Sequence, residues 1–339
     1  MKLRYEKFDL QLKHTFTIAR GSRDVHTVVL VELEHDGITG YGEASPLLRY
    51  DETADSVITF LKKVNPEKIA NPFHMERNIQ YIESLSEKDS SARAALDIAL
   101  HDWTGKALGV PLYKLWGLSP DDAPVTSFTI GIDTPDILKK KIHEAEEYPL
   151  LKIKLGGNND EEIMNTIRSV TDKVVRVDAN EGWTSRDDAL EKTLWLQGNN
   201  VEFVEQPMPS AQLQDMQWLR EQASVPMIAD ENVVSRYDVP ILAKAFDGIN
   251  IKLMKCGGLN AALKMIYTAR SMKMKVMLGC MVESSIAVSA AAQLSPLLDY
   301  ADLDGNLLIK NDPFEGVKVR EGRLILPDKP GIGVSKIGG

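Results

Sequence analysis

Several features that define whole classes of proteins are scarce or missing in this 339-residue sequence. It has only two cysteines, Cys256 and Cys280, without metal-type spacing, so we expect no disulfide framework and a reducing compartment. There is no Lys/Arg tract and the formal net charge is −9, which argues against a nucleic-acid binder. No stretch reaches the roughly 18 apolar residues that span a bilayer, and the N-terminus lacks the apolar core of a signal peptide. These absences predict a cytoplasmic protein that binds neither nucleic acid nor membrane.

The residues that are present can build a large core. The sequence is 43% hydrophobic and 26% charged, and its length suits one barrel of about 200–250 residues with a smaller domain. Residues 1–118 predict an α+β domain, because Asp36-Gly37 marks a hairpin between two β-rich runs and amphipathic helical stretches follow. The expected strands are 3–12, 27–34 and 37–42, and the expected helices are 52–64, 74–85 and 90–108.

Residues 119–307 repeat a strand followed by a helix. Five polar strand ends, 22 to 27 residues apart, carry this repeat: Lys152, Asp178, Glu205, Asp230 and Lys252. Such a period is typical of stacked βα units, and in a closed barrel the carboxyl ends of the strands meet at one mouth. The eight expected strands are 125–132, 150–154, 174–177, 201–204, 225–229, 249–251, 275–279 and 298–303. The expected helices are 135–147, 160–171, 185–198, 210–223, 235–246 and 258–273.

The last part of the chain, 308–339, is rich in Gly and Pro and has one expected short strand near 322–325. It is too short for a separate domain, so we expect it to pack against the N-terminal unit. The predicted organisation is therefore a domain at 1–118, a barrel at 119–307 and a returning segment at 308–339.

Three carboxylates lie at the ends of three consecutive strands: Asp178, Glu205 and Asp230. Hard divalent cations prefer oxygen ligands, and no His/Cys cluster accompanies these residues, which argues against zinc. Each acidic residue alone could instead cap the helix that follows it. Three in successive register are better explained by a Mg²⁺ site.

Lysines are expected on opposite sides of the same mouth. Lys152 and Lys154 are two residues apart on one strand, so both point to one face, and we expect their repulsion to lower a pKa toward that of a general base. Lys252 lies four strands further on, which is diametrically opposite in a ring of eight. Lys255 competes for its role but, three residues away, is expected to point elsewhere. This pairing suits removal of a proton from one face of a carbon and its return to the other.

Two further groups suggest substrate contacts. Asp302 and Asp304 close the eighth strand with both carboxylates on one face, which suits an ammonium group, although a loop cap before Gly305 is an alternative. Arg20 and Arg23 lie on an expected loop between two N-terminal strands, where an arginine fork suits a carboxylate. Solvated surface arginines are the alternative for this pair.

Taken in order, these motifs resemble the enolase superfamily, and within it the muconate-lactonizing-enzyme subgroup, over nearly the whole chain. The matching elements are Lys152-x-Lys154, Asp178-Ala-Asn180, Glu205-Gln-Pro207, Asp230-Glu231, Asn250-Ile-Lys252 with Gly257-Gly258, Tyr41-Gly-Glu43 and residues 94–102.

The resemblance implies an α/β fold in which a (β/α)7β TIM-like barrel is covered by an α+β capping domain formed by the N-terminal region and the C-terminal tail. It implies one Mg²⁺ held by Asp178, Glu205 and Asp230, and an enediolate formed from a substrate carboxylate. Lys154 and Lys252 would be the two acid/base catalysts. Lys152 would hold the carboxylate and depress the pKa of Lys154.

Within the subgroup, Asp302 and Asp304 resemble the dipeptide epimerases, where such a pair receives the substrate's ammonium group. Residues 19–23 and 300–305 look most like the L-Ala-D/L-Glu epimerases of murein-peptide metabolism, where a loop arginine partners the glutamate side chain; the sequence leaves Arg20 and Arg23 open. Thr129, Cys280 and Met281 complete the candidate substrate contacts, the last two along the peptide backbone.

The two lysines are shared by other members of the subgroup, so alternatives remain. One is an epimerase of other dipeptides or an N-acylamino acid racemase. Another is a lyase, such as an o-succinylbenzoate synthase or a dehydratase, and a third is a binding protein without catalysis. The expected partner is a small dipeptide, a homo-oligomer stays open, and the sequence does not assign either lysine to one epimer.

Overall fold

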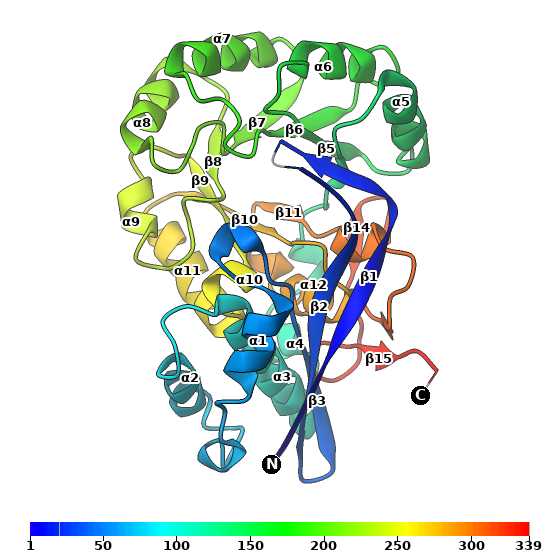
Figure 1. The fold of residues 1–339 in the computed structure, drawn as a ribbon, viewed down its shortest axis with the longest axis vertical. Coiled ribbons are helices and arrows are strands. Elements are labelled where there is room, and N and C mark those ends of the chain that lie inside the picture. Colours follow the sequence, from blue (N-terminus) through cyan, green and yellow to red (C-terminus); the bar gives the residue numbers. More distant parts are fainter. Residues whose placement is uncertain (20, 339) are drawn as a thin grey trace.

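Eight parallel strands, in sequence order around the sheet, form a closed barrel in the computed structural model, which describes residues 1–19 and 21–338 (Figure 1). The ring closes where Thr126 bridges Ala301 in parallel and the Ser127 N–H donates to the Ala301 carbonyl at 3.2 Å. The barrel strands are β4 (Phe128–Ile130), β5 (Leu150–Lys154), β6 (Val174–Asp178), β7 (Val201–Glu205), β8 (Met227–Ala229), β9 (Gly248–Lys252), β10 (Lys275–Gly279) and β11 (Tyr300–Asp302).

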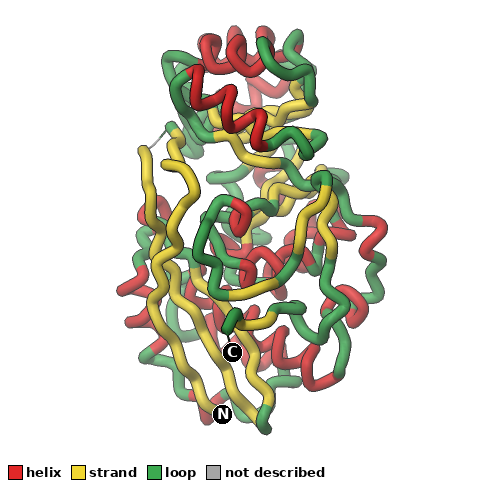
Figure 2. The backbone as a smooth tube through the Cα atoms, turned by 90° about the vertical axis from the view of Figure 1, so that its right-hand side faces the viewer, coloured by secondary structure: helices red, strands yellow, loops and turns green. Residues whose placement is uncertain are grey.

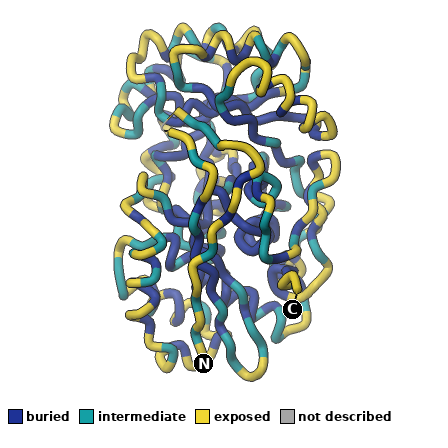
Figure 3. Tube along the Cα trace, turned by 45° about the vertical axis from the view of Figure 1, so that its right-hand side comes forward, coloured by how far each residue is buried: buried dark blue, intermediate teal, exposed yellow. Residues whose placement is uncertain are grey.

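Helices connect successive barrel strands and cover the outside of the ring. Their outward faces are exposed while the strands they cover are buried (Figure 3), as expected for parallel strands covered on both faces. The connecting helices are α5 (Pro135–Glu144), α6 (Asp160–Arg168), α7 (Arg186–Gln197), α8 (Leu213–Gln222), α9 (Val239–Leu242), α10 (Leu253–Cys256), α11 (Leu259–Ser271) and α12 (Ser285–Ala292), with a 3-10 turn at Ser295–Leu297.

The predicted barrel is confirmed, with shorter elements where proline intervenes. Strand β8 begins after Pro226, which has no N–H to give to a strand ladder. The helix expected at 235–246 is reduced to the single turn of α9, because Pro240 is tolerated only in the first turn of a helix. The first and eighth strands are also shorter than their β-rich runs.

An antiparallel sheet of three strands, together with the helices that follow it, forms the capping domain beside the barrel (Figures 1 and 2). Gly42 lets this sheet pack closely against the helix that contains Ala95, since a Cβ at position 42 would lie 1.9 Å from the Ala95 carbonyl oxygen. The elements are β1 (Lys2–Ile18), β2 (Gly21–His35), β3 (Ile38–Ala44), α1 (Ala54–Leu61), α2 (Met75–Glu83), α3 (Ser90–Leu108) and α4 (Leu112–Leu115), with 3-10 turns at Leu48–Tyr50, Pro66–Lys68 and Pro120–Asp122.

Strands β1 and β2 extend well beyond the residues expected for them. Register pairs continue to Phe16 with Arg23 and to Ile18 with Gly21, so Arg23 lies within a strand and not in the expected loop. The end of this long hairpin reaches the barrel mouth, where the Ile132 N–H donates to the Thr17 carbonyl at 3.0 Å (Figure 1). The hairpin thereby carries residues of the capping domain to the carboxyl ends of the barrel strands.

Residues after the barrel return to β1. The Lys13 N–H donates to the Leu308 carbonyl at 2.8 Å, and the Lys310 N–H donates to the Gln11 carbonyl at 2.9 Å. The short strands here are β12 (Phe314–Glu315), β13 (Lys318–Arg320), β14 (Arg323–Ile325) and β15 (Ser335–Lys336), with a 3-10 turn at Gly305–Leu307. Both described ends of the chain therefore lie on the capping side (Figure 2).

Across the described ranges 1–19 and 21–338, the helices are too short or too polar for any of them to traverse a bilayer. Cys256 and Cys280 are both free thiols.

Candidate active site

A cavity lies where the capping domain meets the carboxyl ends of the barrel strands. The capping residues on its wall are Phe16, Ile18, Arg23, Leu47 and Tyr50. The barrel side is mostly polar, and its lining residues include Lys152, Lys154, Asp230, Lys252, Asp302 and Asp304, with Thr129, Cys280 and Met281 beside them. Strand geometry explains the convergence, because polar residues at the carboxyl ends of parallel strands face one mouth.

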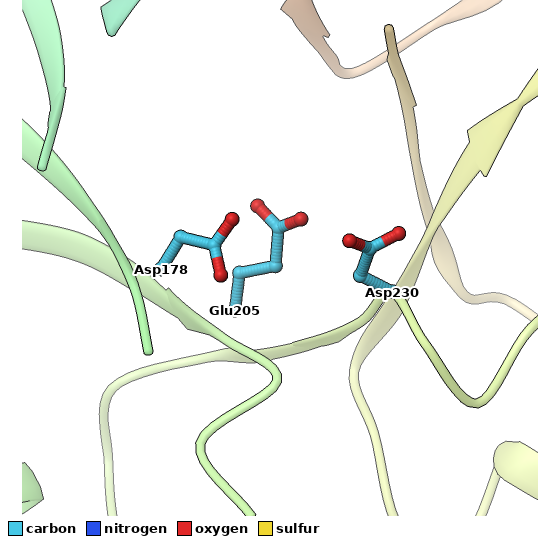
Figure 4. A group of neighbouring side chains, drawn as sticks. All are labelled: Asp178, Glu205 and Asp230. Carbon is cyan, nitrogen blue, oxygen red and sulfur yellow. The ribbon is translucent and has the colours of Figure 1, made fainter. Parts of the chain in front are cut away.

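Asp178, Glu205 and Asp230 form a compact carboxylate cluster at this mouth (Figure 4). Asp178 and Glu205 are register partners at the ends of β6 and β7, and Asp230 directly follows β8. All three side chains are buried, and an oxygen from each lies within 4.8 Å of the others. Buried carboxylates need a compensating cation.

The cluster fits a hard divalent ion such as Mg²⁺. Its donors are carboxylate oxygens alone, which is the ligand type that Mg²⁺ takes. Within the described part of the chain, Glu205 Oε2 receives no hydrogen bond of good geometry, and its contact is an ion pair with Lys152 Nζ at 2.7 Å. Burial and the neighbouring charge of Asp178 raise the pKa of Glu205 to about 7, which marks an excess of negative charge at this point.

On the β5 side, Lys152 is the hub of an ion-pair network. Its Nζ lies 3.0 Å from Asp178 Oδ2, 2.7 Å from Glu205 Oε2 and 2.7 Å from Asp302 Oδ2. Lys154 Nζ contacts Asp178 Oδ2 at 2.7 Å. The alternation of side chains along β5 thus places both amines inside the barrel, as expected.

The net effect of the surroundings on the pKa of Lys152 is upward. Burial disfavours its charged form, but the charges of Asp178, Asp302 and Glu205 outweigh burial and raise its pKa well above the usual value. Repulsion between the two amines was expected to lower the pKa of at least one of them. In the structure each amine lies closer to carboxylates than the strand spacing alone could indicate.

On the β9 side, Lys252 Nζ lies 2.8 Å from Asp230 Oδ2. Burial opposes the charge of Lys252, but Asp230 outweighs it and raises the pKa of this lysine. The same interaction, together with Lys255, holds the pKa of Asp230 well below its usual value against the effect of burial. Lys154 and Lys252 stand four strands apart in the eight-stranded ring, on strands β5 and β9.

Lys255 points away from the cavity wall, as expected, but it contacts the carboxylate cluster, which the sequence did not indicate. Its side chain is fully buried, and its Nζ donates to Asp230 Oδ1 at 2.5 Å, to the Asp230 carbonyl at 2.6 Å and to the Asn250 carbonyl at 3.0 Å. Lys255 leaves the strand direction because α10 begins directly after Lys252. The helical turn brings the amine behind Asp230, so both oxygens of that carboxylate contact a lysine.

Asn250 is a further contact that the motif reading missed. Its Nδ2 donates to Glu205 Oε1 at 2.7 Å from a fully buried position. The signal was present, because Asn250 and Lys252 are two residues apart on β9 and share a face. A buried asparagine on the lysine face of a barrel strand predicts a partner at the same mouth.

Asp302 and Asp304 are close together but have different partners. Asp302 accepts hydrogen bonds from Lys152 Nζ at 2.7 Å and Ser127 Oγ at 2.6 Å, and Lys152 lowers its pKa against the effect of burial. Asp304 Oδ2 accepts the Thr129 N–H at 2.6 Å. Burial and the charge of Asp302 raise the pKa of Asp304 to about 6. The second carboxylate is therefore the one in need of a positive partner.

The remaining candidate contacts are divided between the cavity and the undescribed part of the chain. Arg23 and the segment Cys280–Val282 both line the cavity, Arg23 from the capping domain and the segment from the barrel. Cys280 Sγ lies 3.3 Å from the Asp302 carbonyl and 4.0 Å from Asp304 Oδ1. Arg20 lies outside the described residues.

Two family models together match most of the chain. The model described as "Enolase C-terminal domain-like" matches residues 138–336, and that described as "Mandelate racemase / muconate lactonizing enzyme, N-terminal domain" matches residues 6–117. These ranges correspond to the barrel with the returning segment and to the capping domain.

Similar proteins are full-length matches. The L-Ala-D/L-Glu epimerase of Bacteroides thetaiotaomicron is 52% identical over 338 residues, covering 99% of this chain and 88% of the relative. The L-Ala-D/L-amino acid epimerase of Pedosphaera parvula is 40% identical, covering 98% of this chain and 99% of the relative. Among solved structures, the dipeptide epimerase of Enterococcus faecalis V583 complexed with Mg and L-Leu-L-Tyr aligns with a TM-score of 0.92 at 32% identity, covering 98% of this chain and 99% of that chain.

Proposed function

Because the chain belongs to the mandelate racemase / muconate lactonizing enzyme family of the enolase superfamily, we propose that it is a Mg²⁺-dependent dipeptide epimerase interconverting L-Ala-D-Glu and L-Ala-L-Glu. The observation that carries the proposal is the placement of Lys154 and Lys252 on opposite strands of one mouth. The buried Asp302 and Asp304 lie beside them. Proton transfer and recognition of an amino terminus thus fall within one cavity.

The two lysines perform the proton transfer. One takes the α-proton of the C-terminal residue on its neutral Nζ, and the electron pair of that C–H bond moves toward the substrate carboxylate. The opposite lysine, as an ammonium, gives a proton to the other face of the same carbon. The residue's configuration is inverted, and the reverse reaction exchanges the two roles.

A Mg²⁺ held by Asp178, Glu205 and Asp230 would supply positive charge beside the substrate carboxylate, which reduces the cost of removing the neighbouring proton. Lys152 is buried beside two of these residues and would pair with the same carboxylate. Asn250 and Lys255 hold Glu205 and Asp230 from outside the cluster. These contacts fix the cluster before substrate binds.

The ends of the substrate are assigned as follows. Asp302 and Asp304 receive the ammonium group, Thr129 borders that site, and Cys280 and Met281 follow the peptide backbone. Arg23 lines the cavity from the capping side and would meet a side-chain carboxylate there, and Arg20 is assigned the same role on the sequence alone. D-Glu occurs in murein peptides, so we propose use of these peptides in the cytoplasm as the setting.

A different side chain at the C-terminal residue is the second candidate. The relative from Pedosphaera parvula carries the broader name L-Ala-D/L-amino acid epimerase, so acidic specificity depends on local residues more than on the shared lysines. Asp302 already pairs with Lys152, but an N-acylamino acid would bring no positive charge to the buried Asp304, whose pKa is raised by burial and by Asp302. This observation ranks dipeptides above N-acyl substrates. An o-succinylbenzoate synthase or dehydratase reaction ranks below them for the same reason.

The test is a dipeptide library in D₂O with Mg²⁺, followed by mass spectrometry and chiral analysis. We expect deuterium at the α-carbon of the C-terminal residue, both epimers as products, and the largest rate with L-Ala-D-Glu. Exchange with N-acyl substrates and not with dipeptides would overturn the dipeptide assignment. Appearance of an alkene would instead support the lyase.

A further inference from the structure

We infer that His26 is a positioning residue for substrate specificity: through a directed chain of hydrogen bonds it fixes Arg23 at the cavity wall, where the guanidinium meets the substrate's side-chain carboxylate. The inference deepens the proposed function and rests on it. Arg23 Nη1 lies 3.2 Å from His26 Nδ1, His26 Nε2 lies 2.8 Å from Ser45 Oγ, and Ser45 Oγ donates to the Val282 carbonyl at 2.9 Å.

Only one placement of the hydrogen atoms satisfies all three of these hydrogen bonds. Arginine has donors and no acceptor, so His26 Nδ1 must accept and must carry no proton. The ring proton therefore resides on Nε2 and is donated to Ser45 Oγ, whose own proton goes to the Val282 carbonyl. In all three hydrogen bonds the donor is the group nearer to the Arg23 guanidinium on the capping hairpin, and the last acceptor is a carbonyl of the barrel.

This series of hydrogen bonds connects the capping wall of the cavity with its barrel wall. Arg23 and Val282 both line it, while His26 and Ser45 lie behind the wall at 7% and 1% exposure. Val282 belongs to the segment with Cys280 and Met281 that follows β10. Fixing the hairpin to this segment orients the guanidinium before substrate arrives, so less ordering is needed on binding.

The electrostatic environment is consistent with this tautomer. Burial and the charge of Arg23 lower the pKa of His26 to about 4, so the imidazole is neutral at physiological pH. A neutral ring can accept from Arg23, whereas an imidazolium would present a second donor and a like charge.

The variants are His26→Leu, which removes the acceptor, and His26→Asn, whose Oδ1 can replace Nδ1. His101→Leu is the matched control, because His101 is also 7% exposed and contacts Asp97 at a site outside the cavity wall. KM and kcat are measured with L-Ala-D-Glu and with L-Ala-D-Leu. Arg23→Met is measured with the same pair.

For His26→Leu we expect KM for L-Ala-D-Glu to rise about tenfold while kcat changes less, with a much smaller change for L-Ala-D-Leu. His26→Asn should recover part of the loss, and Arg23→Met should show the full loss of preference. Equal losses with both substrates in His26→Leu, as in the His101→Leu control, would overturn the inference in favour of a structural role. Loss of acid preference in Arg23→Met but not in His26→Leu would overturn the chain while leaving acidic recognition intact. A wild-type enzyme that epimerises dipeptides without preferring Glu would instead refute the proposed substrate.

Discussion

The two lysine-bearing sides of the candidate active site differ in the position of their second lysine. On β5, Lys154 has its companion Lys152 two residues earlier on the same face, and that companion contacts three carboxylates inside the barrel. On β9, the companion of Lys252 is Lys255, which comes three residues later, after the strand has turned into α10. Lys255 reaches Asp230 from behind and does not line the cavity.

The difference assigns different tasks to the companions. Lys152 lines the cavity, so its charge is available to a substrate carboxylate. Lys255 is enclosed by Asp230 and the Asn250 carbonyl, so its charge serves the carboxylate cluster alone. In the proposed mechanism the β5 side would therefore combine catalysis with substrate binding, whereas the β9 side would combine catalysis with support of the cluster.

The largest effect is expected from removing each catalytic lysine separately. Lys154→Met and Lys252→Met should each lower epimerisation by about 10²–10⁴-fold. Each variant should still exchange the α-proton of the epimer whose face meets the remaining lysine. The measurement is deuterium uptake from D₂O by the two pure epimers. Loss of exchange from both epimers in both variants would contradict the two-sided assignment.

The support role of Lys255 gives the next effect. Lys255→Met should weaken Mg²⁺ binding by about 10–100-fold, as removal of a group behind a metal ligand does. Calorimetric titration with Mg²⁺ alone measures this without turnover. Lys244→Met, a change at a lysine outside the cavity, serves as the control. Unchanged Mg²⁺ affinity in Lys255→Met would remove the distinction between the two companions.

The ammonium site gives a pH-dependent effect. The pKa of Asp304 is raised to about 6 by burial and by the charge of Asp302, so Asp304 loses its charge as pH falls through 6. KM for L-Ala-D-Glu should rise severalfold below that pH. Asp304→Asn should show the high KM at every pH between 5 and 8. A wild-type KM that stays constant over that range would refute this role of Asp304.

The smallest effect concerns stability where β3 of the capping domain meets the segment between β10 and α12. Burial raises the pKa of Glu43 to about 7 and that of Glu283, beside it, to about 8. Both values lie above that of the unfolded chain, so their neutral forms stabilise the fold at low pH and this contribution is lost as pH rises through 7 and 8. The Tm should fall by a few degrees between pH 6 and pH 9. Glu283→Gln should flatten this dependence, and an identical slope in the variant would contradict the assignment.

Residue patterns were sufficient for those parts of the site that follow strand periodicity. The spacing of Asp178, Glu205 and Asp230 predicted a common mouth because the carboxyl ends of parallel strands meet there, and the structure places them within 4.8 Å. The two-residue alternation likewise placed Lys152 and Lys154 on one face. Periodicity is a property of the backbone, so it can be read from the sequence without knowing any contact.

The parts that were missed depend on tertiary packing. The contact of Lys255 with Asp230 was not anticipated, because a helix begins after Lys252 and redirects the lysine side chain. The direction of the pKa shift of Lys152 could not be read from the sequence, because it depends on carboxylates from three other strands. Arg23 and His26 are three residues apart in sequence, but Ser45 and Val282 complete their chain from distant segments. No local pattern contains those distances.

Because the final residues return to β1, the capping domain cannot be completed until translation is almost finished. The Gln11 N–H donates to Asn311 Oδ1 across 300 residues, and synthesis proceeds at about 5–20 residues per second. The first strand therefore emerges tens of seconds before its partner exists. The barrel can close during translation, whereas one edge of the first-made sheet must wait for nearly the last-made residues, and that interval is when the nascent chain most needs protection from aggregation.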